Sequence, residues 1–372
     1  MPEIFQNNKD STKPAVLIAM LDWGMGHTTR SSTIIKHLIE LNFNVIVCCN
    51  SVQKSILVTE FPFIEYHSLK GYGLSYGSSG WGTRLKLILQ VPKILIRINQ
   101  ENRWLRQFIR EKKPVLIISD NRYGFFSKKI PSILITHQLC IQTGMGHITN
   151  KLIGYINIRF MNRFSRCWVP DSETALNAGG ILSHPQIKPS TPVQYLGCLS
   201  RFDSCSNLTK TFPDILIILS GPEPQRTILE NKVLEQVQSI NCQVTLVRGL
   251  PGTNVQLAVP AHVTVHNYLP TRSLNELLCS AQFVISRSGY TSIMDYLKLG
   301  VSSILIPTPG QAEQEYLANH LSQQGLAIKM SQKDFSIPKC IEIATSFPFK
   351  KTSWPMTAYK EVISREVHSL LS

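Results

Sequence analysis

The sequence lacks three features that would assign it to a familiar class: long apolar runs, paired cysteines and a surplus of acidic residues. No apolar run reaches the ~18 residues that a membrane-spanning helix needs. Residues 1–14 are polar and lack the apolar segment of a signal peptide, so we expect a cytoplasmic protein. The nine cysteines form no CxxC pair. This pattern predicts reduced thiols that pack as small hydrophobes, rather than disulfides or a zinc site.

Acidic residues are scarce, with 24 Asp and Glu against 38 Lys and Arg, which gives a net charge of +14. A basic surface attracts nucleotides, nucleic acids and anionic lipids alike, so the charge does not choose among them. The chain has no interleaving of aromatic and basic residues of the RNA-binding type. We therefore expect no nucleic-acid partner.

The chain is long enough for two hydrophobic cores, and 43% of its residues are hydrophobic. An apolar run at 15–20 ends in a glycine turn, and a helical pattern and a second apolar run at 44–49 follow. This strand–helix–strand order is typical of a parallel sheet. The same order restarts at 214–219, after a polar stretch without periodicity. The expected units are an N-terminal α/β domain at 1–202, a C-terminal α/β domain at 203–354, and a helix at 355–372 that packs back on the N-terminal domain.

Two segments interrupt this order. Residues 70–83 contain five glycines and are expected to form a mobile loop. Residues 84–113 follow with a basic amphipathic helical pattern, which Pro92 divides into two shorter helices. This pattern fits a helix on an anionic membrane, which would place the protein on the inner face of the plasma membrane. It fits equally well a helix that packs on the core and has a solvated basic face.

The strongest local motif is the run at 286–295, which follows an apolar strand and opens a helix. Ser288 and Gly289 stand at this junction, where backbone N–H groups and the helix dipole favour a diphosphate. Asp295 lies about two turns into the helix and can accept hydrogen bonds from ribose hydroxyls. The alternative is an ordinary helix start with hydroxyl caps.

A second motif, at 307–315, follows the next strand of the same half. Its Glu313 and Gln314 carry groups suited to sugar hydroxyls. Loops at the carboxyl ends of neighbouring parallel strands face one crevice, so the two motifs support each other.

With both motifs in this order, residues 263–318 resemble the C-terminal domain of glycosyltransferase family 28. The resemblance implies the GT-B fold of two Rossmann-like domains, and an inverting, metal-independent enzyme that uses a UDP-sugar as co-substrate and no other cofactor. It also implies donor contacts at Arg201, Ser220 and Tyr268. The chain departs from the family in having Asp295 where Glu is usual and fewer glycines in the loop at residue 220, so the base and the sugar stay open.

The loop at 22–27 should face the cleft from the N-terminal domain, with Gly24 and Gly26 at the acceptor. His27 stands at a helix start, where the dipole favours the neutral imidazole of a general base. Asp22 is a second candidate for the base. The alternative is that His27 only caps or packs.

Three further polar residues end later strands of the N-terminal half. Asp120, Arg122 and His137 are expected to contact the acceptor, and His137 is another candidate for the base.

The function expected from these motifs is the transfer of a hexose or N-acetylhexosamine to a hydroxyl of a glycan or glycolipid, such as a lipid-linked cell-envelope precursor. A UDP-sugar epimerase on the same two-domain plan is the alternative. A dinucleotide oxidoreductase is disfavoured because Thr29 stands where a third glycine would follow Gly24 and Gly26.

Overall fold

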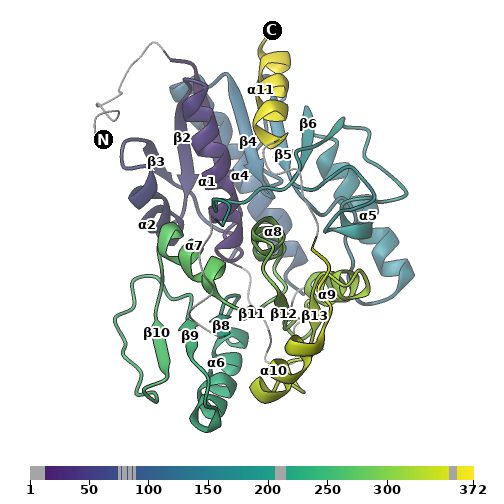
Figure 1. Cartoon of the computed structure of the whole chain (residues 1–372). Coiled ribbons are helices and arrows are strands. Elements are labelled where there is room, and N and C mark those ends of the chain that lie inside the picture. Colours follow the sequence, from purple (N-terminus) through teal and green to yellow (C-terminus); the bar gives the residue numbers. More distant parts are fainter. Residues whose placement is uncertain are drawn as a thin grey trace.

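The computed structural model describes residues 13–73, 77, 82, 86, 89–205, 215–351 and 358–372, in which two parallel sheets with flanking helices lie one beyond the other (Figure 1). The first sheet has the order β3-β2-β1-β4-β5-β6-β7 and the second the order β10-β9-β8-β11-β12-β13. All the described strand pairs are parallel. The predicted α/β class with two parallel sheets is therefore confirmed.

The strands of the first sheet are β1 (Ala15–Met20), β2 (Asn44–Cys49), β3 (Glu65–Ser68), β4 (Leu116–Asp120), β5 (Ser132–Ile135), β6 (Arg166–Val169) and β7 (Val193–Tyr195). Those of the second are β8 (Ile215–Ile218), β9 (Val244–Val247), β10 (Val263–His266), β11 (Phe283–Ser286), β12 (Ser303–Leu305) and β13 (Ile328–Lys329). The helices are α1 (Gly26–Glu40), α2 (Ser51–Glu60), α4 (Val91–Lys112), α5 (His147–Met161), α6 (Gln225–Gln236), α7 (Thr271–Ser280), α8 (Tyr290–Leu299), α9 (Ala312–Gln323), α10 (Ile337–Ser346) and α11 (Ala358–Leu371), with short 3-10 turns at η1 (Gly180–Leu182) and η2 (Val237–Ser239).

The N-terminal sheet is buried on both faces, as its continuous apolar strands predict. Ile18 and Met20 of β1 pack with α1 on one face, whereas Leu17 and Ala19 pack with α4 on the other. The C-terminal sheet repeats this plan, with α7, α8 and α9 on the face toward the first domain and α6 and α10 on the opposite face.

Helix α4 begins at Val91, so Pro92 stands in its first turn, where a missing N–H costs no helical hydrogen bond. Pro92 therefore stands at the start of a helix, where a break between two shorter helices would place it. Ile98 and Leu105 are buried, so the helix packs on the core. Most of the glycine-rich stretch at 70–83 lies outside the described residues.

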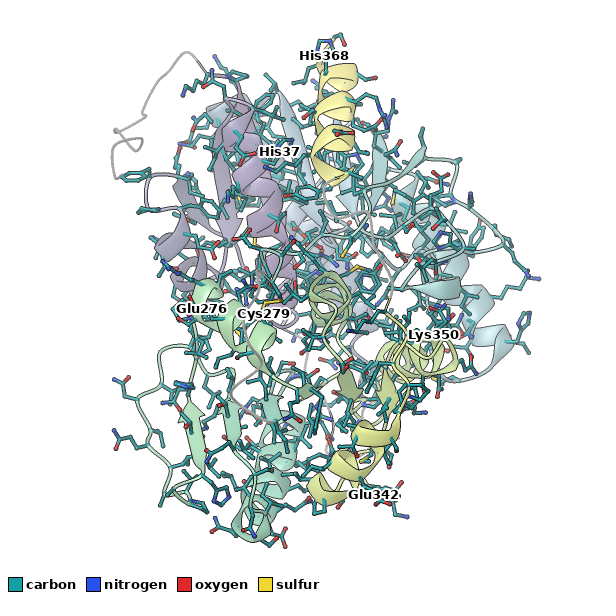
Figure 2. The ribbon with its side chains drawn as sticks, viewed as in Figure 1. His37, Glu276, Cys279, Glu342, Lys350 and His368 are labelled. Atoms are coloured by element: carbon teal, nitrogen blue, oxygen red, sulfur yellow. A yellow bond between two sulfur atoms is a disulfide. The ribbon has the colours of Figure 1, made fainter. Side chains whose placement is uncertain are left out.

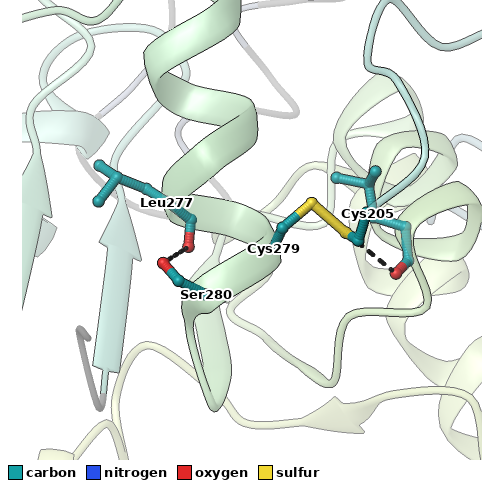
Figure 3. Close-up of a disulfide and its surroundings, with 5 residues drawn as sticks. Cys205, Leu277, Cys279 and Ser280 are labelled. Carbon is teal, nitrogen blue, oxygen red and sulfur yellow. Dashed lines mark hydrogen bonds between the residues drawn. A yellow bond between two sulfur atoms is a disulfide. The ribbon is translucent and has the colours of Figure 1, made fainter. Parts of the chain in front are cut away.

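The prediction that every cysteine is a free thiol is wrong for one pair. Cys205, in the connection between the two sheets, forms a disulfide with Cys279 at the end of α7 (Figure 3). The two residues are 74 positions apart in the sequence, so no local spacing pattern indicated their pairing. The other cysteines form no disulfide, and most of them are buried in the sheets and their flanking layers.

The C-terminal helix α11 returns to the first domain and covers α1 (Figure 1). Ile363 and Val367 are fully buried in the core of that domain. The ring of His37, on α1, points toward α11, and its Nε2 lies 2.9 Å from the Lys360 carbonyl oxygen (Figure 2). The N-terminal core is therefore completed by the last residues of the chain.

Replacing Ile363 with alanine should lower the free energy of unfolding of the N-terminal domain by about 2–5 kcal/mol, because it opens a cavity between α11 and the sheet. Urea denaturation followed by circular dichroism measures this loss. The control is Arg365→Ala, at an exposed position of the same helix. A loss no larger than that of the control would show that α11 does not stabilise the core.

Candidate active site

The site forms where the carboxyl ends of the two sheets face each other. In the first sheet Met20 pairs with Asp120, so the loop that leads into α1 opens beside the end of β4. In the second sheet Ile218 pairs with Ser286, so the loops that lead into α6 and α8 open side by side. Both points are topological switch points, where ligands of doubly wound folds bind.

Residues of both domains line one cavity of about 310 Å³ at this junction. This volume is within the range of small-molecule sites. The predicted site residues that line it are Gly24, Gly26, His27, His137, Arg201, Ser220, Tyr268, Gly289, Asp295, Glu313 and Gln314.

Three helices direct their N-termini at this cavity: α1, α8 and α9. In the described chain none of these three has a side-chain cap, so their first N–H groups are available to an anion. The N-terminus of α6 differs, because Glu223 accepts a hydrogen bond from the Thr227 N–H at 3.2 Å. The ends of α1 and α8 touch, and the Thr291 hydroxyl donates to the Gly26 carbonyl oxygen at 3.2 Å. A Cβ on Gly26 would lie 3.0 Å from the Thr291 hydroxyl oxygen, which explains the small residue there. The arrangement suits a diphosphate.

A buried cation lies behind these helix ends. The Arg287 side chain is 1% exposed, and its guanidinium donates to the Gln225 carbonyl at 2.7 Å and to the carbonyls of Ile306 and Pro307. Burial lowers the pKa of Arg287 to about 10, and its hydrogen-bond partners in the described chain are carbonyl oxygens. Its charge therefore adds to the positive potential of the helix ends.

Ser288, predicted as a donor contact, is fully buried. Its hydroxyl donates to the Gln314 carbonyl oxygen at 2.8 Å and so joins the loop before α8 to α9. The neighbouring Gly289 lines the cavity in its place.

Asp295 lies at the edge of the cavity and is 7% exposed. The Ser200 hydroxyl donates to Asp295 Oδ1 at 2.5 Å. Burial raises the pKa of Asp295 to about 6, and nearby Arg201 and Lys298 only partly oppose this. Arg201 also lines the cavity, and its Nη1 donates to the Thr271 hydroxyl at 3.1 Å.

His27 lines the other side of the cavity, and Asp120 lies beneath it. His27 Nδ1 is 2.8 Å from Asp120 Oδ1, and Arg30 Nε donates to Asp120 Oδ2 at 2.7 Å. Burial alone would raise the pKa of Asp120, but Arg30 and His27 outweigh it and hold that pKa well below its usual range. Asp120 is fully buried, so it supports His27 instead of facing the acceptor.

His137 bridges the two domains. Its Nε2 lies 2.7 Å from Glu313 Oε1 on α9, and Arg30 Nη1 lies 3.2 Å from its Nδ1. Its ring stacks on Tyr290 at a centroid distance of 3.9 Å. Burial lowers the pKa of His137. Burial would raise the pKa of Glu313, but His137 brings it below its usual value, so a neutral imidazole donates to a carboxylate.

Asp22 and Arg122 hold the start of the glycine-rich segment instead of lining the cavity. Asp22 Oδ1 accepts a hydrogen bond from the Tyr72 N–H at 3.1 Å. Arg122 is 1% exposed, pairs with Glu101 at 2.6 Å and donates to the Lys70 carbonyl at 2.7 Å. Both side chains therefore hold residues 70–72 beside the ends of β1 and β4.

Sequence reasoning missed Arg30. A signal was present, because Arg30 precedes Ile34 and Leu38 by four and eight residues, so an α-helix puts this cation on its buried apolar face. It also assigned no role to Arg287, although this residue lies inside the strongest motif.

Within the described ranges, no group of three or more His, Cys, Asp or Glu side chains could hold a metal ion. Nor is any described helix both long and apolar enough to cross a bilayer.

Known proteins resemble this chain in sequence, over its C-terminal domain or over most of its length. Residues 223–363 match the glycosyltransferase family 28 C-terminal domain. A protein of Buchnera aphidicola subsp. Schizaphis graminum (strain Sg), named UDP-N-acetylglucosamine--N-acetylmuramyl-(pentapeptide) pyrophosphoryl-undecaprenol N-acetylglucosamine transferase, is 26% identical over 344 residues, which are 88% of this chain and 87% of the relative. A protein of the same name from Rhodopseudomonas palustris (strain BisB18) is 42% identical over 72 residues, which are 19% of this chain and 18% of the relative.

Solved structures resemble the whole chain. The glycotransferase of kitacinnamycin has a TM-score of 0.63 at 17% identity, with 97% of this chain and 96% of the other covered. Phytolacca americana UGT2, solved with UDP-2fluoro-glucose and pterostilbene, has a TM-score of 0.63 at 14% identity, with 97% and 100% covered. These likenesses establish the predicted two-domain GT-B fold.

The raised pKa of Asp295 makes stability depend on pH. Between about pH 4 and pH 6 the folded protein holds a proton that the unfolded chain has released, so the free energy of unfolding falls as the pH rises. Asp295→Asn lacks this proton. The stability of the wild type relative to Asp295→Asn should therefore fall by about 2–3 kcal/mol from pH 4 to pH 7.

Urea denaturation at several pH values measures this difference. The control is Asp334→Asn, at an exposed position. Parallel stability curves for the wild type and Asp295→Asn would contradict the raised pKa.

Proposed function

We propose that this glycosyltransferase, which carries a family 28 C-terminal domain on the GT-B fold, transfers a hexose or N-acetylhexosamine from a UDP-sugar to a hydroxyl of a lipid-linked cell-envelope glycan. We further propose that the transfer inverts the anomeric carbon and requires no metal ion. One observation carries this proposal: the uncapped N-termini of α1 and α8 and the His27–Asp120 pair meet at one cavity. The names of the relatives supply the donor and acceptor classes.

In this proposal the diphosphate of the donor lies between the starts of α1 and α8. Backbone N–H groups bind its oxygens, and Arg287 adds a fixed positive charge behind them. Asp295 accepts hydrogen bonds from the ribose hydroxyls, and Tyr268 lies beside the base. Glu313 and Gln314 are placed to hold the transferred sugar.

His27 acts as the general base. An ionised Asp120 can only accept hydrogen bonds, so His27 carries its proton on Nδ1 and keeps a lone pair on Nε2. Nε2 takes the proton of the acceptor hydroxyl while its oxygen attacks the anomeric carbon and the bond to the diphosphate breaks. Asp120 then stabilises the imidazolium. Because this is one displacement on the face opposite the leaving group, the configuration inverts.

Positive charge for the leaving diphosphate is supplied by the protein itself. The starts of α1 and α8, together with Arg287, stand where a divalent cation would otherwise balance the developing charge. This arrangement supports a metal-independent reaction.

An exposed face of α4 and α5 supports a membrane-borne acceptor. Ile94 and Ile98 of α4 pack in one cluster with Phe160 of α5, so the two helices are neighbours. Large hydrophobic side chains on and beside these helices are exposed: Leu89, Leu95, Ile96, Met145, Ile148, Leu152, Tyr155 and Ile156. Helix α5 contains no acidic residue, and Lys151 and Arg159 are exposed on it. Apolar side chains among basic ones suit an anionic membrane surface.

The first experiment measures UDP release from UDP-N-acetylglucosamine, UDP-glucose and UDP-galactose, with a lipid-linked pyrophosphoryl N-acetylmuramyl-pentapeptide as acceptor. We expect release with at least one donor. Asp295→Ala should raise the donor KM, because the ribose contact is lost. His27→Ala should lower kcat by about 10²–10⁴-fold, because the base is lost. His368→Ala, at an exposed position of α11, is the control.

The outcomes separate the candidate functions. A UDP-sugar converted to its epimer without UDP release would identify the epimerase of the same fold. No binding of UDP or any UDP-sugar would reject the proposed donor. Metal dependence, tested by adding EDTA, would reject the metal-independent mechanism.

Sedimentation with vesicles tests the membrane surface. The protein should bind vesicles that contain phosphatidylglycerol at low salt, and bind pure phosphatidylcholine vesicles less. Replacing both Ile148 and Leu152 with serine should weaken binding, because these side chains are 84% and 61% exposed on α5. The matched control replaces Ile187 and Val255, which are 69% and 56% exposed outside α4 and α5. Equal binding by both double variants would reject this surface.

A further inference from the structure

We propose that Arg30 is a positioning residue of the transfer reaction, which rests on the function proposed above. In this proposal Arg30 links the His27–Asp120 pair to Glu313 of the donor domain through His137. The link fixes the proton positions of both histidines and balances the charge around the base when the two domains meet.

The hydrogen-bond chemistry of arginine fixes the proton of His137. A guanidinium has only donors, so Arg30 Nη1, at 3.2 Å, must donate to His137 Nδ1. His137 then carries its proton on Nε2, which lies 2.7 Å from Glu313 Oε1 and donates to it. Both ring nitrogens are occupied, so His137 has no lone pair for the acceptor hydroxyl. The sequence alone left open whether His27 or His137 is the general base.

The ionised carboxylate of Asp120 fixes the position of the proton on His27. Asp120 Oδ2 accepts from Arg30 Nε and from the Ser31 hydroxyl, at 2.7 and 3.1 Å. Asp120 Oδ1 faces both Arg30 Nη2 and His27 Nδ1. Arg30 Nη2 is also 2.9 Å from His27 Nδ1. An unprotonated Nδ1 would direct its lone pair at the ionised Asp120 carboxylate at 2.8 Å, so Nδ1 carries the proton and donates to Asp120 Oδ1. Arg30 Nη2 donates to the same oxygen, and Nε2 of His27 is left as the base.

The charged and titratable groups around His27 lie on each of the segments that pack against it. Arg30 is the cation on its own helix, Asp120 lies on β4, Glu313 lies on α9, and neutral His137 follows β5. Before the reaction this group holds one cation and two carboxylates. The proton taken from the acceptor makes it neutral, so the group stabilises the imidazolium that forms.

The second carboxylate belongs to the donor domain. Glu313 reaches the cluster only when α9 lies against His137, and the ring of His137 rests on Tyr290 of the same domain. The charge balance at the base is therefore complete only when the two domains are in contact. This contact would favour removal of the proton when the donor site is assembled.

The pH dependence of kcat/KM tests this role. Without the cation at Arg30, two carboxylates face His27, and its imidazolium persists to higher pH. The acidic limb of the profile of Arg30→Met should therefore move up by about 1 pH unit or more. Arg30→Lys should move it less, since a charge is retained. Glu313→Gln should move it down, because a carboxylate is lost.

The control is Lys36→Met, at an exposed position of α1, whose profile should match the wild type. Lower activity in Arg30→Met and Glu313→Gln with unmoved acidic limbs would overturn the proposal, because a merely structural role predicts that result.

Histidine nitrogen NMR gives a readout that does not need activity. In the wild type, His137, assigned by its loss in His137→Gln, should carry its proton on Nε2 and not on Nδ1. A proton on Nδ1 would overturn the proposal, including for variants that fold poorly. The two failures are distinguishable, because a wild type that releases no UDP rejects the proposed function whereas a misplaced proton rejects the role of Arg30.

Discussion

The contact between the N-termini of α1 and α8 is the constraint on which the site depends. It brings two positive helix ends to one point, which would repel each other unless an anion lay between or beside them. The small residue at position 26 permits this approach, because any Cβ there would press on Thr291. In the proposed function these two like ends bind a diphosphate, and one of them belongs to the part of the chain, residues 223–363, that matches the family 28 model.

The buried charges follow from the same constraint. Arg287 has no acidic hydrogen-bond partner in the described chain, and such burial is costly for the free protein. Arg30 stands on the buried face of α1 and is compensated by Asp120. In the proposed mechanism Arg287 adds to the positive potential at the diphosphate, and Arg30 sets the charge around His27. Both buried cations cost stability, and the proposed function gives a reason for retaining them.

Much of the fold was legible in the sequence because apolar runs and glycine turns are local signals. The strands at 15–20 and 44–49 were predicted with the bounds that the structure gives. The motif at 286–295 was placed at a strand–helix junction because it follows an apolar run and opens a helical pattern, and the structure confirms this. Contacts between distant segments had no such signal. The disulfide between Cys205 and Cys279, and the bridge from His137 to Glu313, depend on how the two domains meet.

Predictions from residue type alone were also wrong about the burial of several side chains. Asp120 and Arg122 follow one strand and were both expected at the acceptor, yet each is buried by a partner from elsewhere in the chain. Arg30 was passed over because it fits a helical pattern, although that pattern puts it on the buried face of α1 with Ile34 and Leu38. A charge on the buried face of a helix needs a partner outside that helix. Such conflicts between local preference and residue choice therefore locate functional networks that motif patterns do not reveal.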